Sequence, residues 1–302
     1  MEEKDNYKDL DNNDYKWNKN NKAFDQYSLM LSHAPYSKHI YSYVSYAKIG
    51  SPDGTNTLSD ITSKVNFSLE KKLNGKNWEV NFEILNTFIN DMNPEGQKIA
   101  EMGKLFATPI SHLILKLTRN GEIDSVQNKG EIAYRWEDLY RNIVKDAINN
   151  DLKNKLRQAG DNDYLNPNIT IKSSFLHSIL FFPIFNKEYN DRKKDIVTFC
   201  DKSKLLQNEQ LRYNLENDIK YLNKDVIAFH YKGEDSSKSL YKKAHKIYKG
   251  IVPEEGTFFQ TLDIFYYVNI QNGLPLLIKT QCTEIVENSI SYIHTSEIKI
   301  TQ

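Results

Sequence analysis

The chain has few cysteines and no long apolar run, and each shortage excludes a class of protein. Its 302 residues include only two cysteines, Cys200 and Cys282, which cannot make a disulfide framework. A chain of this length buries about three quarters of its unfolded surface, so it needs no disulfide or metal ion to fold. The most apolar stretch, residues 175–185, is interrupted by polar residues and is shorter than the roughly 20 residues that cross a bilayer. We therefore predict no membrane-spanning helix.

The N-terminal segment also lacks the apolar core of a signal peptide, because residues 1–30 are rich in Asn, Asp and Lys. We expect a cytoplasmic protein, or one exported without a cleavable signal. Net charge is absent as well, since 40 basic side chains balance 40 acidic ones. Affinity for nucleic acid comes largely from Lys and Arg neutralising phosphates, so we do not expect nucleic acid as the main partner.

Short catalytic and cofactor motifs are missing. With only 12 glycines, the chain has no G-x-S-x-G elbow and no glycine-rich phosphate loop. Its seven histidines are scattered singly, and the best calcium-loop match, residues 91–96, has Met102 where the twelfth position requires a glutamate. The sequence therefore predicts no catalytic residue, no cofactor and no metal site.

Two isolated residues have a chemical alternative. Cys200 follows an apolar run, where a lone cysteine is typically a small buried side chain, although it is also a candidate nucleophile. His177 lies in an apolar segment beside serines, which favours a histidine at the core edge, hydrogen-bonded to backbone, over a general base. We predict the structural role for both.

Four Asx-Gly pairs give the strongest structural signal, because each lies between runs rich in β-forming residues, where such pairs favour tight hairpins. The pairs are Asp53-Gly54, Asn74-Gly75, Asn120-Gly121 and Asn272-Gly273. Alternating apolar residues predict strands around residues 65–69, 78–84, 113–117 and 123–126. The same alternation predicts a strand at 226–231 and a C-terminal three-stranded meander over 262–300.

Helical spacing appears in the middle of the chain. Apolar residues three and four apart predict helices that begin at Pro94, run from Gly130 to about residue 150, cover 175–180 before Pro183, and cover 211–222. The fold class is therefore α+β, with mostly antiparallel twisted sheets built from Asx-Gly hairpins and a central group of helices. We divide the chain into a flexible or partner-ordered arm (1–38), strands followed by helices (39–190), and a helix plus the meander (191–302). The last two parts can also be one domain with one shared sheet.

A cluster of lysines lies in a segment without acidic residues, opposite apolar positions of a predicted short amphipathic helix. It offers a contact for an anionic partner, or else a solvated helix face. The cluster consists of Lys238, Lys242, Lys243, Lys246 and Lys249.

Residues 120–132, which read NGEIDSVQNKGEI and precede Trp136, resemble a segment of uncharacterised α+β proteins of Bacteroidota. The resemblance covers about residues 60–150, and its motif is structural: a turn glycine, strand residues and a helix start. Some of these proteins accompany contractile injection or other interbacterial systems. The resemblance therefore implies an accessory, immunity or cargo-related role and no catalytic residue.

Our first hypothesis is a non-enzymatic interaction or assembly protein, an accessory, immunity or structural component of a bacterial multiprotein system. It would bind another protein or itself through the arm, with Trp17, Phe24 and Tyr27 as contacts. One alternative is a carrier that holds an apolar ligand between curved sheet and helices. Its lining would be Leu176, Phe181, Phe182 and Phe185. The other alternative is an enzyme whose active-site residues are dispersed along the chain.

Overall fold

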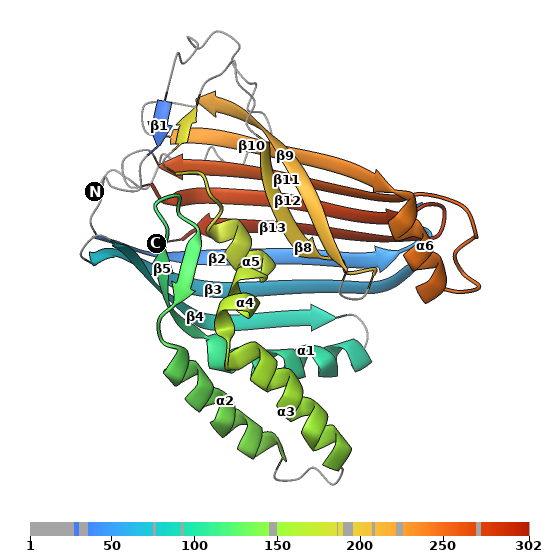
Figure 1. Ribbon diagram of the computed structural model, residues 1–302, viewed down its shortest axis with the longest axis horizontal. Coiled ribbons are helices and arrows are strands. Elements are labelled where there is room, and N and C mark those ends of the chain that lie inside the picture. Colours follow the sequence, from blue (N-terminus) through green and yellow to red (C-terminus); the bar gives the residue numbers. More distant parts are fainter. Residues whose placement is uncertain are drawn as a thin grey trace.

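The computed structural model describes residues 27–29, 36–74, 77–91, 94–144, 150–185, 187–189, 196–206, 209–221, 226–269 and 273–301. In these residues, one antiparallel sheet of 11 strands has the order β6-β5-β4-β3-β2-β13-β12-β11-β10-β9-β8 (Figure 1). The first group of strands is β2 (Tyr36–Gly50), β3 (Thr57–Asn74), β4 (Asn77–Asp91), β5 (His112–Leu117) and β6 (Ile123–Val126). The second group is β8 (Ile196–Lys202), β9 (Gln210–Tyr221), β10 (Val226–Ser237), β11 (Phe258–Asn269), β12 (Pro275–Val286) and β13 (Ile290–Ile300).

The two groups of strands meet where β2 pairs with β13, and that pairing extends from Tyr41 opposite Ile300 to Gly50 opposite Ser291. Strands from before and after the helical part of the chain therefore belong to one sheet. A separate two-stranded ribbon pairs β1 (Tyr27–Leu29) with β7 (Lys187–Tyr189). The predicted α+β class with mostly antiparallel sheet is confirmed.

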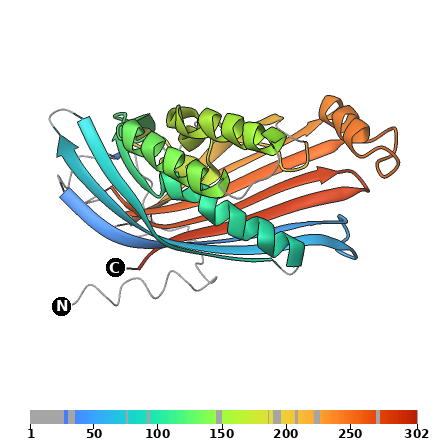
Figure 2. The same ribbon diagram turned by 90° about the horizontal axis from the view of Figure 1, so that it is seen from below.

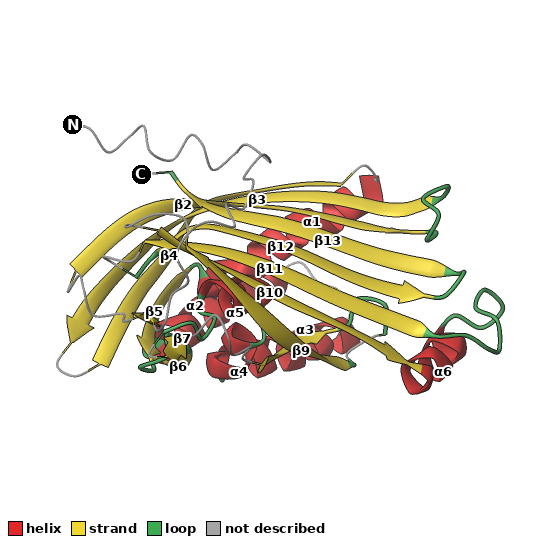
Figure 3. Cartoon of the chain, turned by 90° about the horizontal axis from the view of Figure 1, so that it is seen from above, coloured by secondary structure: helices red, strands yellow, loops and turns green. Residues whose placement is uncertain are grey.

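The sheet is curved, and a group of helices lies on one of its faces (Figures 2 and 3). These helices are α1 (Pro94–Ala107), α2 (Lys129–Val144), α3 (Asn150–Tyr164), α4 (Pro167–Lys172) and α5 (Phe175–Leu180). The helix α6 (Lys238–Ile247) follows β10 at the far end of the sheet (Figure 1). None of the helices in the described ranges is both long enough and apolar enough to cross a membrane.

Alternation of buried and more exposed residues along β9 and β11 places one face of each of these strands in the core. In β11, for example, Leu262, Ile264 and Tyr266 are buried and the residues between them are less so. The Tyr266 hydroxyl donates a hydrogen bond to the carbonyl oxygen of Ile179 in α5. The ring of Phe182 packs against Tyr266 at 5.6 Å between centroids. Aromatic residues of the sheet therefore fix the end of α5 over the concave face.

Glycines with positive φ occupy three of the predicted turns. Gly54 (φ 77°) lies between β2 and β3, Gly121 (φ 91°) lies between β5 and β6, and Gly273 (φ 67°) lies between β11 and β12. L residues rarely adopt this conformation, which explains glycine at these positions. The predicted turns at Asn74-Gly75 and Asn272-Gly273 lie partly outside the described residues.

The helix predicted over 211–222 is wrong, because residues Gln210–Tyr221 form strand β9. The apolar spacing of four residues on which that prediction rested is a multiple of the strand period of two as well as one helical turn. Leu211, Tyr213 and Leu215 are buried, whereas Arg212 and Asn214 between them are exposed. The remaining predicted helices and strands are observed close to their expected places.

Candidate functional site

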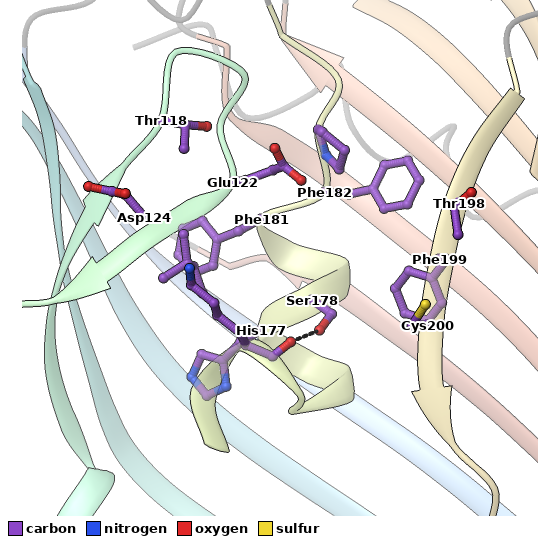
Figure 4. A pocket seen from close by; sticks show the side chains of 13 residues that line it. Thr118, Glu122, Asp124, His177, Ser178, Phe181, Phe182, Thr198, Phe199 and Cys200 are labelled. Atoms are coloured by element: carbon purple, nitrogen blue, oxygen red, sulfur yellow. Dashed lines mark hydrogen bonds between the residues drawn. The ribbon is translucent and has the colours of Figure 1, made fainter. Parts of the chain in front are cut away.

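An open pocket of about 410 Å³ lies where the two outermost strands of the curved sheet, β6 and β8, approach α5 (Figure 4). One wall is the β5–β6 hairpin, from Thr118 to Asp124. The second wall is the end of α5 with the residues that follow it, and the third is β8, from Thr198 to Cys200. The pocket therefore brings together three segments that are distant in the sequence.

Side chains of α4 and α5 hold these helices between the two strands. The Asn168 side-chain oxygen of α4 accepts a hydrogen bond of 2.7 Å from the Val126 backbone N–H of β6. On the other side, the rings of Phe175 and Phe199 meet edge to face with centroids 6.1 Å apart. Pro167 is the first residue of α4. A backbone N–H at this position would have no acceptor within the helix, so proline, which lacks that N–H, costs no hydrogen bond there. The helices are thus attached to both outermost strands.

The floor of the pocket is apolar and already packed. Ile123, Phe181, Phe182 and Phe199 line it, and all four are buried. Phe182 is supported from below by Tyr231, at 4.8 Å between ring centroids. Phe182 and Phe199 also pack against each other, at 6.2 Å between ring centroids, so this part of the floor keeps its shape without a ligand, which lowers the entropic cost of binding.

The rim of the pocket is polar and carries both signs of charge. Glu122 of the hairpin points toward the space between the hairpin and the segment after α5 (Figure 4). Asp124 makes an ion pair of 3.0 Å with Lys116. Across the pocket, Lys172 is exposed, and its carbonyl oxygen accepts a hydrogen bond of 2.8 Å from the Ser178 hydroxyl. The site therefore combines an apolar floor with hydrogen-bonding and charged groups at its mouth.

His177 borders the pocket but belongs mostly to the core, with 5% of its surface exposed. Its Nδ1 lies 2.9 Å from the Ser174 hydroxyl. The hydrogen-bond partner is thus a side chain, whereas the sequence predicted a backbone group. Its ring meets Phe82 edge-on at 4.9 Å. Burial lowers the pKa of His177 to about 4, so the imidazole is neutral at pH 7. This geometry gives it no substrate-facing base role.

Cys200 is exposed, which corrects the prediction that it is a buried side chain. The preceding apolar run belongs to an outermost strand, in which alternate residues face opposite sides. Phe199 and Asp201 of β8 are buried on the inner side, and Cys200 between them is left at the pocket. Burial depends here on which face of the strand a residue occupies, which the local apolar run does not indicate.

The pocket contains part of the lining predicted for a carrier. Phe181 and Phe182 line it, Phe185 lines a smaller cavity nearby, and Leu176 is partly buried against the core. Sequence reasoning missed the polar rim, because Glu122, Lys172 and Thr198 share no local motif. Among the described residues, no three His, Cys, Asp or Glu side chains gather in a way that could hold a metal ion.

The lysine cluster lies on and just after α6, far from the pocket, and its five side chains are exposed (Figure 1). Lys243 makes an ion pair of 2.6 Å with Glu209. Lys238 and Lys242 line a second open cleft together with acidic residues, among them Glu254 and Glu287. Acidic side chains from other parts of the chain therefore lie close to the lysine cluster, although residues 238–249 themselves contain none.

The predicted arm contacts lie mostly beyond the described part of the chain. Trp17 and Phe24 are outside the described residues. Tyr27 lies in β1, opposite Tyr189 of β7.

A buried carboxylate organises the turn after β8. Glu284 of β12, which is 2% exposed, accepts hydrogen bonds from the backbone N–H groups of Lys204 (2.9 Å) and Leu205 (3.2 Å) and from the Ser203 hydroxyl. Burial raises the pKa of Glu284, and these hydrogen bonds oppose that shift. Because these three donors belong to the turn itself, the Glu284 carboxylate anchors the turn.

Comparison with known proteins adds no family. No family model matches the chain, and no curated protein matches it either. One solved structure that matches is DynF from the dynemicin biosynthesis pathway of Micromonospora chersina, at 6% sequence identity and a TM-score of 0.20. That match covers 93% of this chain and 87% of DynF. A likeness of this degree carries no argument about the fold or the activity.

Proposed function

We propose that the protein is a carrier that binds a small molecule with an apolar body in the pocket between β6, α5 and β8. The observation that carries this proposal is the floor of buried aromatic side chains, Phe181, Phe182 and Phe199, beneath an open space of about 410 Å³. Pockets for small molecules have volumes of about 300–1,000 Å³ and are lined mainly by apolar and aromatic side chains with a few polar groups.

The polar groups at the rim restrict the kinds of ligand that the pocket can bind. Glu122, Asp124 and Lys172 lie at the mouth, and Lys116 forms an ion pair with Asp124, so charges of both signs are present and the pocket favours no strongly charged ligand. The hydroxyls of Ser178 and Thr198 provide neutral hydrogen-bonding groups. The ligand that fits is amphipathic, with its apolar body on the phenylalanines and its polar end at the rim.

The test fills the pocket from its exposed side and leaves the core intact. Thr198→Trp places an indole at the mouth from β8, and Gln281→Trp is the matched control, because Gln281 is an exposed residue in the middle of β12. We would titrate each protein with the uncharged apolar dye N-phenyl-1-naphthylamine and measure its fluorescence. Native mass spectrometry of the purified wild type would detect a co-purifying ligand.

Wild type and Gln281→Trp should bind the dye equally. The Thr198→Trp protein should bind it at least about tenfold more weakly, which corresponds to about 1.4 kcal/mol. Unfolding curves of all three proteins would show that the change is local. Equal binding by Thr198→Trp and wild type would overturn the carrier proposal.

The interaction hypothesis stays a separate proposal, with the accessory or immunity role that the resemblance implied. Its test is a pull-down from source cells with full-length protein and with a variant beginning at Tyr36, where β2 starts. A partner lost only from the shortened protein would support docking through the arm. A partner retained equally by both would contradict it.

A further inference from the structure

A smaller cavity of about 30 Å³ lies next to the pocket and shares the lining residue Phe181 with it. Its lining includes Leu69, Leu117, Leu180, Phe181 and Phe185, and among the described lining residues Lys71 alone carries a charge. A volume of this size holds about one small group, because a water needs roughly 10–15 Å³ on the same measure. An amine thus borders a small apolar space inside the protein.

Lys71 is almost completely buried, with 1% of its surface exposed. It lies on the same face of β3 as Phe67 and Leu69, and its Nζ is 4.8 Å from the centre of the Trp78 ring. Burial lowers the pKa of Lys71 to about 8, so about a tenth of the amine is neutral at pH 7, far more than for an ordinary lysine. Neutral lysines in apolar surroundings are the ones that attack carbonyl groups.

A second buried polar group lies beside this amine. Ser37 of β2 is the direct cross-strand neighbour of Lys71, and directly opposed residues have Cβ atoms about 4.5–5.5 Å apart. The Ser37 hydroxyl is buried and has no hydrogen-bond partner among the described residues. Leaving a buried hydroxyl without a partner is unfavourable, because the group has lost its hydrogen bonds to water. The hydroxyl is therefore available to a polar group that enters next to Lys71.

Phe181 lies between the two spaces, because it lines both the pocket and the smaller cavity. Phe181 comes directly after Leu180, the last residue of α5. Rotation of this one side chain would join the cavity to the pocket. A ligand body on the phenylalanine floor would then have its end directed toward Lys71.

We propose that Lys71 forms an imine with an aldehyde whose apolar body occupies the pocket. This inference rests on the proposed carrier function and names its ligand class. The amine nitrogen attacks the carbonyl carbon, the carbonyl oxygen leaves as water with the two amine protons, and a C=N bond replaces C=O. No oxidant or reductant is needed. The Ser37 hydroxyl donates a hydrogen bond to the carbonyl oxygen during the attack, and the apolar lining keeps out the water that would hydrolyse the imine.

The test uses cinnamaldehyde as the probe and full-length protein near pH 7. Sodium cyanoborohydride converts any imine into a stable secondary amine, which peptide mapping by mass spectrometry assigns to a residue. Cinnamyl alcohol, which has the same apolar body but cannot form an imine, measures binding alone. Lys71→Arg keeps the charge without the primary amine. Lys72→Arg is the matched control, because Lys72 is the exposed neighbour paired with Glu79 at 2.8 Å.

We expect the reduced adduct on Lys71 of wild type and of Lys72→Arg, and its loss in Lys71→Arg. Phe181→Ala should speed its formation several-fold. Adducts confined to exposed lysines while cinnamyl alcohol still binds would overturn the imine and leave the carrier function standing. If cinnamyl alcohol did not bind, that result would count against the carrier function. The peptide map of the wild type would still show whether Lys71 carries the adduct. That map decides even if Lys71→Arg fails to fold.

Discussion

Gly160 of α3 lies directly against the indole of Trp136 of α2, so close that a Cβ at position 160 would come within 2.0 Å of the indole Cζ2. The indole is buried, and its Nε1 donates a hydrogen bond of 2.8 Å to the side chain of Asp161. The ring of Tyr164 packs on the same indole at 5.1 Å between centroids. The two helices therefore meet through one tryptophan whose place depends on the absence of a side chain at residue 160.

This contact predicts that Gly160→Ala destabilises the protein, although alanine is the better helix former. Overpacking a filled site typically costs about 1–3 kcal/mol, which exceeds the gain in helix propensity of about 1 kcal/mol. Gly103→Ala in α1 is the control, because its added Cβ would meet nothing within 4 Å apart from its chain neighbours and the backbone of its own helix. That substitution should stabilise the protein slightly. Urea unfolding of both variants measures the difference, and a Gly160→Ala protein as stable as Gly103→Ala would contradict the packing.

The two buried histidines predict a loss of stability in mild acid. Burial lowers the pKa of His177 to about 4, and burial together with the Lys204 ammonium lowers the pKa of His294 to about 4. The unfolded chain has an ordinary histidine pKa near 6.5, so it binds more protons than the folded protein between pH 6.5 and 4. Stability should therefore fall as the pH drops through this window, by about 1.4 kcal/mol per unit of pKa difference for each histidine.

The variant His177→Phe should flatten this dependence, because phenylalanine keeps the ring contact with Phe82 and does not titrate. Unfolding free energies of wild type and variant, measured at several values between pH 4 and pH 7, give the two slopes. An unchanged slope in the variant would show that His177 does not contribute to the acid sensitivity.

The sequence indicated most local elements but not their assembly. Alternation identified β5 and the C-terminal strands, and Pro94 marked the start of α1, because these signals act between near neighbours. The spacing in residues 211–222 fitted two periods at once, and only the pairing of β9 with β8 and β10 decides between them. The pocket and the buried Lys71 depend on long-range pairing, which leaves no local pattern.

Ser203 is predicted to be important for the turn after β8. Its hydroxyl donates to the buried carboxylate of Glu284 and accepts a hydrogen bond of 2.9 Å from the Leu206 backbone N–H. In Ser203→Ala one buried donor and one buried acceptor each lose a partner, which should cost about 1–3 kcal/mol. Ser239→Ala, at an exposed position of α6, is the control and should change little.

Hydrogen exchange of residues 203–206 in these two variants locates the effect. Faster exchange there in Ser203→Ala, with unchanged exchange in the meander strands β11 and β13, would show local loosening of the turn. Protection equal to wild type would mean that Glu284 holds the turn through the Lys204 and Leu205 backbone alone.

The two cysteines should react very differently with a thiol reagent such as dithionitrobenzoate. Cys200 is exposed at the pocket, whereas Cys282 is buried and its pKa is raised to about 12 by burial. The thiolate is the reacting form, so the native protein should release the colour of one thiol rapidly and the unfolded protein that of two. A ligand in the pocket should also slow modification of Cys200, since that residue lines it. Fast reaction of both thiols in the native state would contradict the burial of Cys282, and equal rates with and without a bound ligand would place the ligand away from β8.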